Sequence, residues 1–353
     1  MTRVLVTGSG GYIGQVLVPL ARARGWEVVG LDAGYFESCD VPGMDVAMPE
    51  ISKDVRDLEP SDLRGFDAVI HLAGLSNDPL GELNPGLTSE INYAASVRLA
   101  SAAREAGVKR FVFSSSCSVY GARSNRPVIE EDELEPLTAY AVSKVETELA
   151  VSKLASPDFC PVYLRNATVY GLSPRLRFDL VVNNLAGWAH TTGVIRIMSD
   201  GSPWRPLIHV ADVSNAFLAA VEAPTESVWN QSFNIGTDRD NYTVKDIATL
   251  VNEAYPACEV SYSDSPPADS RSYRVDFSKA RRTLPGFQPG WTLAAGIAEL
   301  RDKFRAVNLS LDDFQGPKFT RLKHIQTLQA QGLLDGGLRS TPGLALSGAA
   351  AAG

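Results

Sequence analysis

The sequence predicts an α/β protein built on a Rossmann-type, doubly wound parallel sheet, joined to a smaller α/β domain. Three features lead to this prediction. Short apolar runs alternate with longer helical patterns, a glycine cluster follows the first run, and the pattern changes after about residue 166. Strands that alternate with helices need crossover connections, which make neighbouring strands parallel. Because the runs are apolar on both faces, we expect helices on both sides of the sheet.

Hydrophobic periodicity places the individual elements. Strands are expected at residues 4–7, 28–31, 68–72 and 110–113, with helices at residues 13–24, 88–106 and 140–154. Further helices are expected at residues 179–190, 210–222, 244–254 and 293–306, among shorter strands. Two domains are predicted, at residues 1–165 and 166–308, and some elements of the second are expected to return to the first. A helical extension at residues 309–338 and a flexible tail at residues 339–353 are expected to follow. The tail is mostly Gly, Ala and Ser, which cannot form a packed core.

Composition excludes several classes of protein. The 353 residues are 44% hydrophobic and 21% charged, which is typical of a globular protein. A net charge of −8 and a pI near 5.2 argue against a nucleic-acid partner. The chain has no apolar run of about 18 residues and no signal-peptide pattern, so we expect no membrane partner and a cytoplasmic location. Its four cysteines lack metal-site spacing, so we expect reduced thiols and no metal.

A glycine-rich turn between the first strand and the first helix predicts a phosphate-binding site. It reads Thr7-Gly8-Ser9-Gly10-Gly11-Tyr12-Ile13-Gly14. Glycines permit a tight turn and a close approach to a pyrophosphate, which the helix N-terminus then attracts. Glycines also form ordinary turns, but the position between strand and helix favours dinucleotide binding. Asp32 closes the second strand, where a carboxylate binds a ribose and repels a 2′-phosphate, so NAD is favoured over NADP.

A tyrosine and a lysine at helical spacing indicate acid–base chemistry. Tyr140 and Lys144 stand four residues apart, so they share one helix face. An ammonium beside a phenol favours the phenolate, which would lower the tyrosine pKa and make it a usable base. Such a pair is often only a surface pair. Here it follows the fourth strand and the hydroxyl-rich segment 114–118, and hydroxyls at the end of a parallel strand lie in the ligand crevice.

Together these motifs resemble the extended short-chain dehydrogenase/reductase family, and most closely its nucleotide-sugar branch, typified by UDP-galactose 4-epimerase. The resemblance covers residues 1 to about 305. Besides the glycine turn and the Tyr140/Lys144 pair, it rests on His71-Leu72-Ala73-Gly74-Leu75, Asn92, Ser114-Ser115-Ser116 and Val119-Tyr120-Gly121.

The resemblance implies roles for residues in the first domain. Ser116, Tyr140 and Lys144 would be catalytic, with Tyr140 as the acid/base. The residues implied to bind NAD are Gly8, Gly11, Tyr12, Ile13, Gly14, Asp32, Asp54, Val55, Leu72, Ala73, Gly74, Asn92, Ser114, Tyr140 and Lys144. Of these, Asp54 and Val55 would face the adenine, and Asn92 would brace the site from its helix. The less favoured alternative for Asn92 is a helix-surface amide.

The resemblance also implies a site for the substrate diphosphate. The residues implied to bind substrate are Ser76, Ser116, Thr168, Asn183, Arg205 and Arg271. Arginine suits this role because its planar guanidinium matches phosphate oxygens. Arg175 and Arg177 could add positive potential nearby. Two positions depart from the family pattern: Ser76 replaces a lysine and Thr168 replaces an asparagine. His190 and His324 are interpreted as structural.

The predicted function is an NAD-dependent nucleotide-sugar epimerase that acts through a transient 4-keto sugar. Dehydration is disfavoured, because Cys117-Ser118 stands where dehydratases carry an acidic pair. One alternative is an NAD(P)H-dependent nucleotide-sugar 4-ketoreductase. A second, from another class, is a catalytically silent protein that senses a dinucleotide. The family resemblance also implies a homodimer, formed through the helices at residues 88–106 and 140–154.

Overall fold

The computed structural model describes residues 1–76, 78, 81, 84–122, 126–263 and 271–341. Within them, the main sheet has seven strands, all parallel, in the order β10-β6-β5-β4-β1-β2-β3. In chain order these are β1 (Arg3–Thr7), β2 (Glu27–Asp32), β3 (Ile51–Ser52), β4 (Ala68–His71), β5 (Arg110–Ser116), β6 (Cys160–Asn166) and β10 (Gln231–Ile235). This order is that of a doubly wound Rossmann sheet, so the predicted fold class is confirmed.

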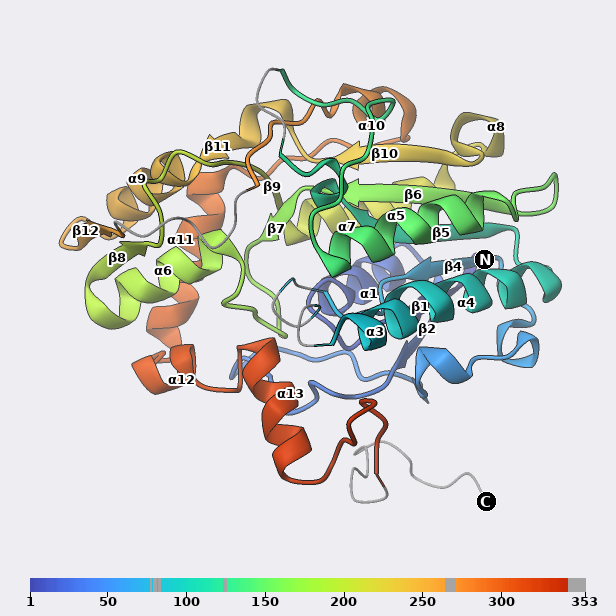
Figure 1. Cartoon of the computed structure of the whole chain (residues 1–353), viewed down its shortest axis with the longest axis horizontal. Coiled ribbons are helices and arrows are strands. Elements are labelled where there is room, and N and C mark those ends of the chain that lie inside the picture. Colours follow the sequence, from blue (N-terminus) through green and yellow to red (C-terminus); the bar gives the residue numbers. More distant parts are fainter. Residues whose placement is uncertain (77, 79–80, 82–83, 123–125, 264–270, 342–353) are drawn as a thin grey trace.

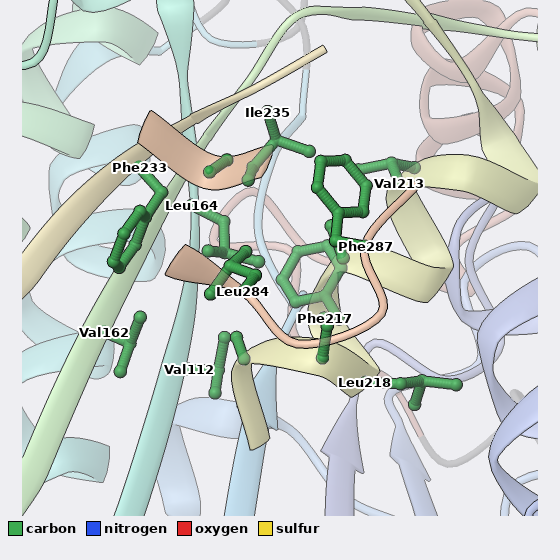
Figure 2. Close-up of a cluster of buried hydrophobic side chains, with 14 of the residues drawn as sticks. Val112, Val162, Leu164, Val213, Phe217, Leu218, Phe233, Ile235, Leu284 and Phe287 are labelled. Carbon is green, nitrogen blue, oxygen red and sulfur yellow. The ribbon is translucent and has the colours of Figure 1, made fainter. Parts of the chain in front are cut away.

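Helices cover both faces of this sheet (Figure 1). Along β1, Val4 and Val6 point into one core and Leu5 into the other, as strand geometry requires. The first core packs against α1 (Gly14–Ala23), α7 (Val210–Glu222) and α10 (Ser278–Thr283), and the second against α4 (Ala95–Glu105) and α5 (Ala139–Ser152). Figure 2 shows side chains of β5, β6, β10 and α7 meeting in the first core. Both α7 and β10 thus return from the second half of the chain to the large sheet.

The second half also forms a smaller unit with its own core. Its elements are β7 (Thr168–Tyr170), β8 (Val194–Ile197), β9 (Trp204–His209), β11 (Asn241–Thr243), β12 (Glu259–Tyr262), α6 (Val181–Thr192), α9 (Val244–Ala254) and α11 (Leu293–Ala306). Strands β11, β9 and β7 form one sheet, and β12 pairs with β8. A cluster of buried side chains from α6, α9 and α11 fills the interior of this unit.

The C-terminal segment returns to the first domain. It contains α12 (Leu311–Gln315) and α13 (Arg321–Ala330), two helices where the sequence suggested one, and a bridge between Leu334 and Ser340. Ile325, Leu328, Leu334 and Leu338 pack on residues of the first domain. The described part of the predicted tail, residues 339–341, makes hydrogen bonds to the rest of the chain. Residues 342–353 lie outside the described residues.

The described residues also form several shorter elements. They are α3 (Pro85–Thr88), a π-helical turn (Ser89–Ala94), α8 (Thr225–Val228) and 3-10 turns at Val55–Asp57, Pro60–Leu63, Cys117–Tyr120 and Asp238–Asp240. Among the described residues, the helices are too short or too polar to cross a membrane.

Candidate active site

The glycine turn forms a tight cradle at the end of β1. Gly8 has φ = +73°, and a Cβ placed there would lie 2.7 Å from the backbone nitrogen of Ala73. A Cβ on Gly14, the first residue of α1, would lie 2.5 Å from the carbonyl oxygen of Gly8. Only glycine fits both positions, so the backbone is free to approach a pyrophosphate at the start of α1. The cradle therefore fits a dinucleotide.

Asp32 lies beside this cradle at the end of β2. Its Oδ2 accepts a hydrogen bond from the Gly10 nitrogen at 3.0 Å, and its Oδ1 accepts one from the Gly34 nitrogen at 2.8 Å. Burial raises the pKa of the carboxyl, while these two bonds act in the opposite direction. The carboxylate is held in one orientation and keeps acceptor capacity for ribose hydroxyls.

One pocket brings most of the predicted cofactor residues together. It is lined by Gly8, Gly11, Tyr12, Ile13, Gly14, Asp32, Asp54, Val55, Leu72, Ala73 and Gly74. Asp54 also has a structural role: it caps the 3-10 turn after it and pairs with the Arg56 guanidinium at 2.6 Å. Of the four other predicted cofactor residues, Ser114, Tyr140 and Lys144 line a neighbouring cleft, and Asn92 lines neither.

Asn92 supports the pocket from behind. It is buried in the π-helical turn, where its Oδ1 accepts from the Leu75 nitrogen at 2.7 Å and its Nδ2 donates to the Leu75 oxygen at 3.0 Å. These two bonds fix the loop that carries Gly74. The predicted bracing position is therefore observed, and the helix-surface alternative is wrong. The π-helical turn at this place was not visible in the sequence; such turns are frequent at functional sites.

The three candidate catalytic residues converge on the neighbouring cleft. Ser116 ends β5, whereas Tyr140 and Lys144 lie on α5, which begins after the Thr138 cap. Tyr140 is hydrogen-bonded to Ser116. The Lys144 Nζ lies 5.5 Å from the centre of the Tyr140 ring and donates to the Ser114 carbonyl oxygen at 2.8 Å. The cleft thus holds a phenol, a hydroxyl and an ammonium close together.

The pKa of Tyr140 differs from the expectation. Burial, and then the negative charge of Asp78, raise the pKa of Tyr140 to about 12, against the opposing effects of Arg177, Ser116 and Arg271. Lys144 is not among the main contributors to this shift, and burial lowers the pKa of Lys144 itself to about 8. The groups of this chain alone therefore keep the phenol protonated at neutral pH.

The same cleft contains five of the six candidate substrate residues. Ser76, Ser116, Thr168, Arg205 and Arg271 line it. Asn183 does not. It is fully buried, accepts from the Gly171 nitrogen at 3.0 Å and donates to the Arg177 oxygen at 3.0 Å. Its amide is used to hold the loop before α6, so its action on a ligand is at most indirect.

Several residues of the cleft were missed or underrated by sequence reasoning. Asp78 accepts from Thr138 at 2.7 Å and pairs with Arg271 at 2.7 Å, next to Tyr140. Arg177 donates to the Ser76 hydroxyl at 2.9 Å and pairs with Asp179 at 2.6 Å. These contacts join segments far apart in the chain. No local pattern in one sequence could have revealed them.

Comparisons with known proteins agree with this geometry. The model of the NAD dependent epimerase/dehydratase family matches residues 4–236. UDP-glucose 4-epimerase from Mycolicibacterium smegmatis is 32% identical over 316 residues, covering 86% of this chain and 98% of that protein. UDP-glucose 4-epimerase from Thermotoga maritima, solved with UDP-glucose, has a TM-score of 0.76 and 27% identity, covering 87% of this chain and 100% of that one. The structure of MoeE5 with UDP-glucose and NAD has a TM-score of 0.74 and 30% identity, covering 86% and 99%.

Proposed function

This chain belongs to the NAD-dependent epimerase/dehydratase family, and we propose that within it the chain is a nucleotide-sugar 4-epimerase acting on a UDP-hexose. The enzyme uses NAD. UDP is favoured as the nucleotide because relatives that match nearly end to end are named UDP-glucose 4-epimerases, and one was solved with UDP-glucose.

One observation carries the proposal: the dinucleotide pocket adjoins the cleft that Tyr140 lines. The two share a wall made of Tyr12, Ile13, Leu72, Gly74, Ser76 and Arg177. A sugar carbon beside the Tyr140 hydroxyl is therefore next to the end of the dinucleotide pocket. Hydride transfer needs this adjacency, because donor and acceptor must be in contact.

The residues of the cleft divide the chemical work between them. Tyr140 takes the proton of the sugar 4-hydroxyl, and Ser116 holds that hydroxyl and the phenol in line. When bound, NAD supplies the hydride acceptor and a positive charge near the phenol. Because burial and the charge of Asp78 raise the pKa of Tyr140 to about 12, an added positive charge is what the phenol needs to act as a base.

The substrate half supplies binding energy away from the reacting ring. Arg205 and Arg271 line the cleft and suit the two phosphates of a nucleotide diphosphate. Holding the diphosphate leaves the hexose free to turn over, so that hydride returns to its other face. Binding at a distance from the reacting carbon can then position the sugar without freezing it.

A proton-NMR assay tests the function. Purified protein is incubated with UDP-glucose, UDP-galactose or a panel of other nucleotide sugars, without added cofactor and with NAD or NADH. We expect interconversion of C4 epimers without added reductant. A strict need for stoichiometric NADH or NADPH would instead identify a 4-ketoreductase. No turnover of any sugar, with NAD bound, would favour a silent dinucleotide sensor.

Tyr140→Phe is the matching variant for this assay. We expect it to bind NAD and UDP-sugar but to lose about 100- to 10,000-fold in kcat, because general acid–base catalysis contributes about 10²–10⁴-fold. Val142→Ala, a change on the outer face of the same helix, serves as the control and should keep near-normal turnover. Normal turnover by Tyr140→Phe would overturn the proposed role of the phenol.

Two further proposals concern the state of the enzyme. All four cysteines are unbonded, which favours a reducing compartment such as the cytoplasm. We also propose a homodimer. Helix α5 exposes Val142 and Leu149, which lie two helical turns apart on one side, at 38% and 58% exposure.

A further inference from the structure

A buried arginine from the C-terminal segment reaches the dinucleotide pocket. We call residues 309–341 the C-terminal strap. Arg321, at the start of α13, lines the pocket together with Gly8, Gly11 and Asp32. It does not line the cleft that holds Tyr140. Arg321 also lies outside residues 4–236, the stretch matched by the family model.

The guanidinium of Arg321 is held in place but only partly satisfied. The residue is 3% exposed, and its guanidinium stacks 4.0 Å above the Phe36 ring. Its Nη2 donates to the Arg175 carbonyl oxygen at 2.9 Å. Its Nη1 is buried and has no hydrogen-bond partner among the described residues. A buried donor without a partner costs free energy, so this atom is suited to an acceptor that enters the pocket.

The charges around Arg321 are unbalanced. Arg175 forms an ion pair with Asp40 at 2.6 Å, and Arg177 forms one with Asp179 at 2.6 Å. Among the described residues, no carboxylate lies within ion-pair distance of Arg321. Burial, and then the charge of Arg177, lower the pKa of Arg321 to about 10, which still leaves it positive at neutral pH. The pocket thus holds, next to the glycine cradle, a cation that has no ion-pair partner among the described residues.

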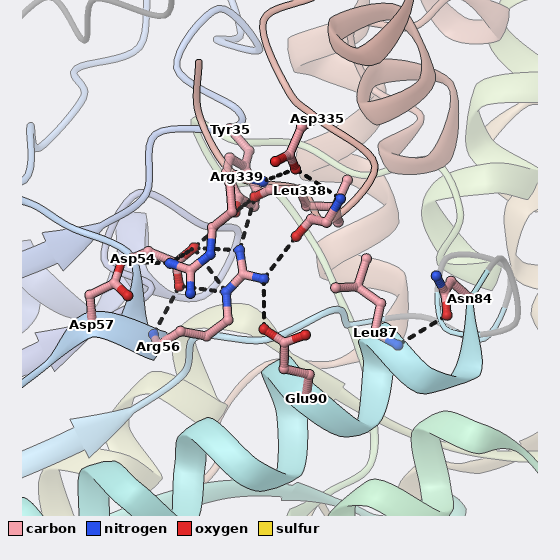
Figure 3. Close-up of polar contacts among 11 residues, drawn as sticks. Tyr35, Asp54, Arg56, Asp57, Asn84, Leu87, Glu90, Asp335, Leu338 and Arg339 are labelled. Atoms are coloured by element: carbon pink, nitrogen blue, oxygen red, sulfur yellow. Dashed lines mark hydrogen bonds and ion pairs between the residues drawn. The ribbon is translucent and has the colours of Figure 1, made fainter. Parts of the chain in front are cut away.

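The strap is fastened beside the pocket by Arg56. The Arg56 side chain is 1% exposed and donates to the carbonyl oxygens of Gly337 at 2.8 Å and Leu338 at 3.0 Å. It also pairs with Asp54, a pocket residue, and with Glu90 at 3.1 Å (Figure 3). Tyr35, another pocket residue, donates to the same Leu338 oxygen. The strap therefore shares hydrogen-bond partners with the wall of the pocket.

We propose that Arg321 is an additional NAD-binding residue of this enzyme, whose Nη1 donates to a phosphate oxygen of the dinucleotide, and that the strap exists to hold it there. The ligand group is the NAD diphosphate and not a 2′-phosphate, because the Asp32 carboxylate in the same pocket would repel the latter. The inference rests on NAD binding in the glycine-lined pocket, which is part of the proposed function.

Binding of NAD⁺ to nucleotide-free protein, measured by calorimetry, tests this role directly. We compare the wild type with Arg321→Met, which removes the charge but keeps the bulk of the side chain. Lys323→Met is the matched control, since Lys323 lies on the same helix and its Nζ donates to the Gln315 carbonyl oxygen on the exposed side. Losing a charge-assisted hydrogen bond should weaken NAD⁺ binding by about 10- to 100-fold, whereas the control should stay within about twofold.

Two further readouts separate a binding role from a structural one. Arg321→Met without nucleotide should melt at or above the wild-type temperature, because it removes a buried, incompletely paired cation. Its melting temperature should then rise less than the wild type's when NAD⁺ is added. Should Arg321→Met fail to fold, Arg321→Lys decides: it keeps the charge without the planar fork and should bind NAD⁺ several-fold more weakly.

The outcomes are distinct from those for the catalytic proposal. The role of Arg321 would be overturned if folded Arg321→Met bound NAD⁺ with an affinity within about twofold of wild type. Where only Arg321→Lys folds, the same criterion applies to that variant. Tyr140→Phe should bind NAD⁺ normally, so turnover by that variant would refute the catalytic assignment and leave Arg321 untouched. Absence of NAD⁺ binding by the wild type would refute both.

Discussion

Lys144 is a residue whose burial conflicts with its charge. It is 5% exposed, and burial lowers its pKa from 10.5 to about 8, while Glu148 acts in the opposite direction. Below pH 8 the folded protein therefore carries a charged ammonium that would be better hydrated in the unfolded chain. Its hydrogen bond to the Ser114 carbonyl and its position over the Phe113 ring offset part of that cost. A buried lysine of this kind destabilises the fold and is consistent with the catalytic role proposed for it.

This conflict predicts that Lys144→Met stabilises the nucleotide-free protein while abolishing turnover. A pKa shift of two to three units corresponds to about 3 kcal/mol of destabilisation, and the variant also loses one hydrogen bond worth about 1 kcal/mol. The free energy of unfolding at pH 7 should therefore rise on the order of 2 kcal/mol. The pKa of Lys144 is lower in the folded protein than in the unfolded chain. The destabilisation that Lys144 causes in the wild type therefore decreases as the pH rises from about 8 towards 10.5. Urea unfolding at pH 7 and pH 9.5 should therefore show a gap between the variants that narrows at high pH. A constant gap, or a less stable variant, would contradict this account.

At the scale of single residues, sequence spacing predicted some functional positions, whereas positions that depend on long-range packing could not be predicted. The Tyr140–Lys144 spacing and the strand-end serine were enough to predict the cluster, because both follow from local geometry. The sequence predicted a lowered pKa for Tyr140, but the pKa is raised in the structure. The causes, burial and the charge of Asp78, depend on the folded chain. Asn183 was assigned to a ligand, yet its amide is used by the backbone of Gly171 and Arg177.

At the scale of elements, helix α5 presents different residues on its two sides. Its inner side places Tyr140 and Lys144 in the cleft, while its outer side exposes Val142 and Leu149. Helix α4 lies next to α5 in the fold (Figure 1), so the two together present a candidate surface for a second copy of the chain. Apolar side chains exposed in this way on a helix face are suited to a protein contact.

This surface predicts that Leu149→Glu converts a dimer into a monomer. A glutamate placed in an apolar contact leaves a buried charge without a partner, which costs several kcal/mol in each copy. Light scattering after gel filtration should give twice the chain mass for the wild type and the single chain mass for the variant. Leu311→Glu, an exposed leucine on α12, should leave the dimer intact. A monomeric wild type, or a dimeric Leu149→Glu, would refute the proposed surface.

The elements of the first domain were predictable because strong periodicity and strand–helix alternation fix them. All four strands that the first half predicted are present, within one to three residues at their ends. The π-helical turn at Ser89–Ala94 was not predictable, since it depends on the bonds between Asn92 and the Leu75 loop. The strap was predicted only as one docked helix, because its contacts with Asp54 and Arg56 depend on distant parts of the chain.

At the scale of the whole molecule, two arginines fasten the strap to the first domain, and their environments differ. Arg56 is buried and contacts Gly337 and Leu338 through their carbonyl oxygens. Arg339 is 38% exposed and pairs with Asp57 at 2.5 Å and Asp54 at 3.4 Å. Removing one partner of a buried charge network is costly, while an exposed ion pair contributes little. The strap should therefore depend on Arg56 far more than on Arg339.

Limited proteolysis with a non-specific protease tests this difference. Arg56→Met should cost about 3 kcal/mol, because it leaves the Asp54 carboxylate and two backbone carbonyls short of a partner, and much of that cost should appear as local opening of the strap. Cleavage within residues 309–341 should then become at least about tenfold faster, while residues 1–308 stay protected. Arg339→Met should change the rate by less than about fivefold, as expected for an exposed pair.

Because NAD binding would add a contact through Arg321, saturating NAD should slow strap cleavage in the wild type. Equal cleavage rates for the two variants would show that Arg56 does not hold the strap in place.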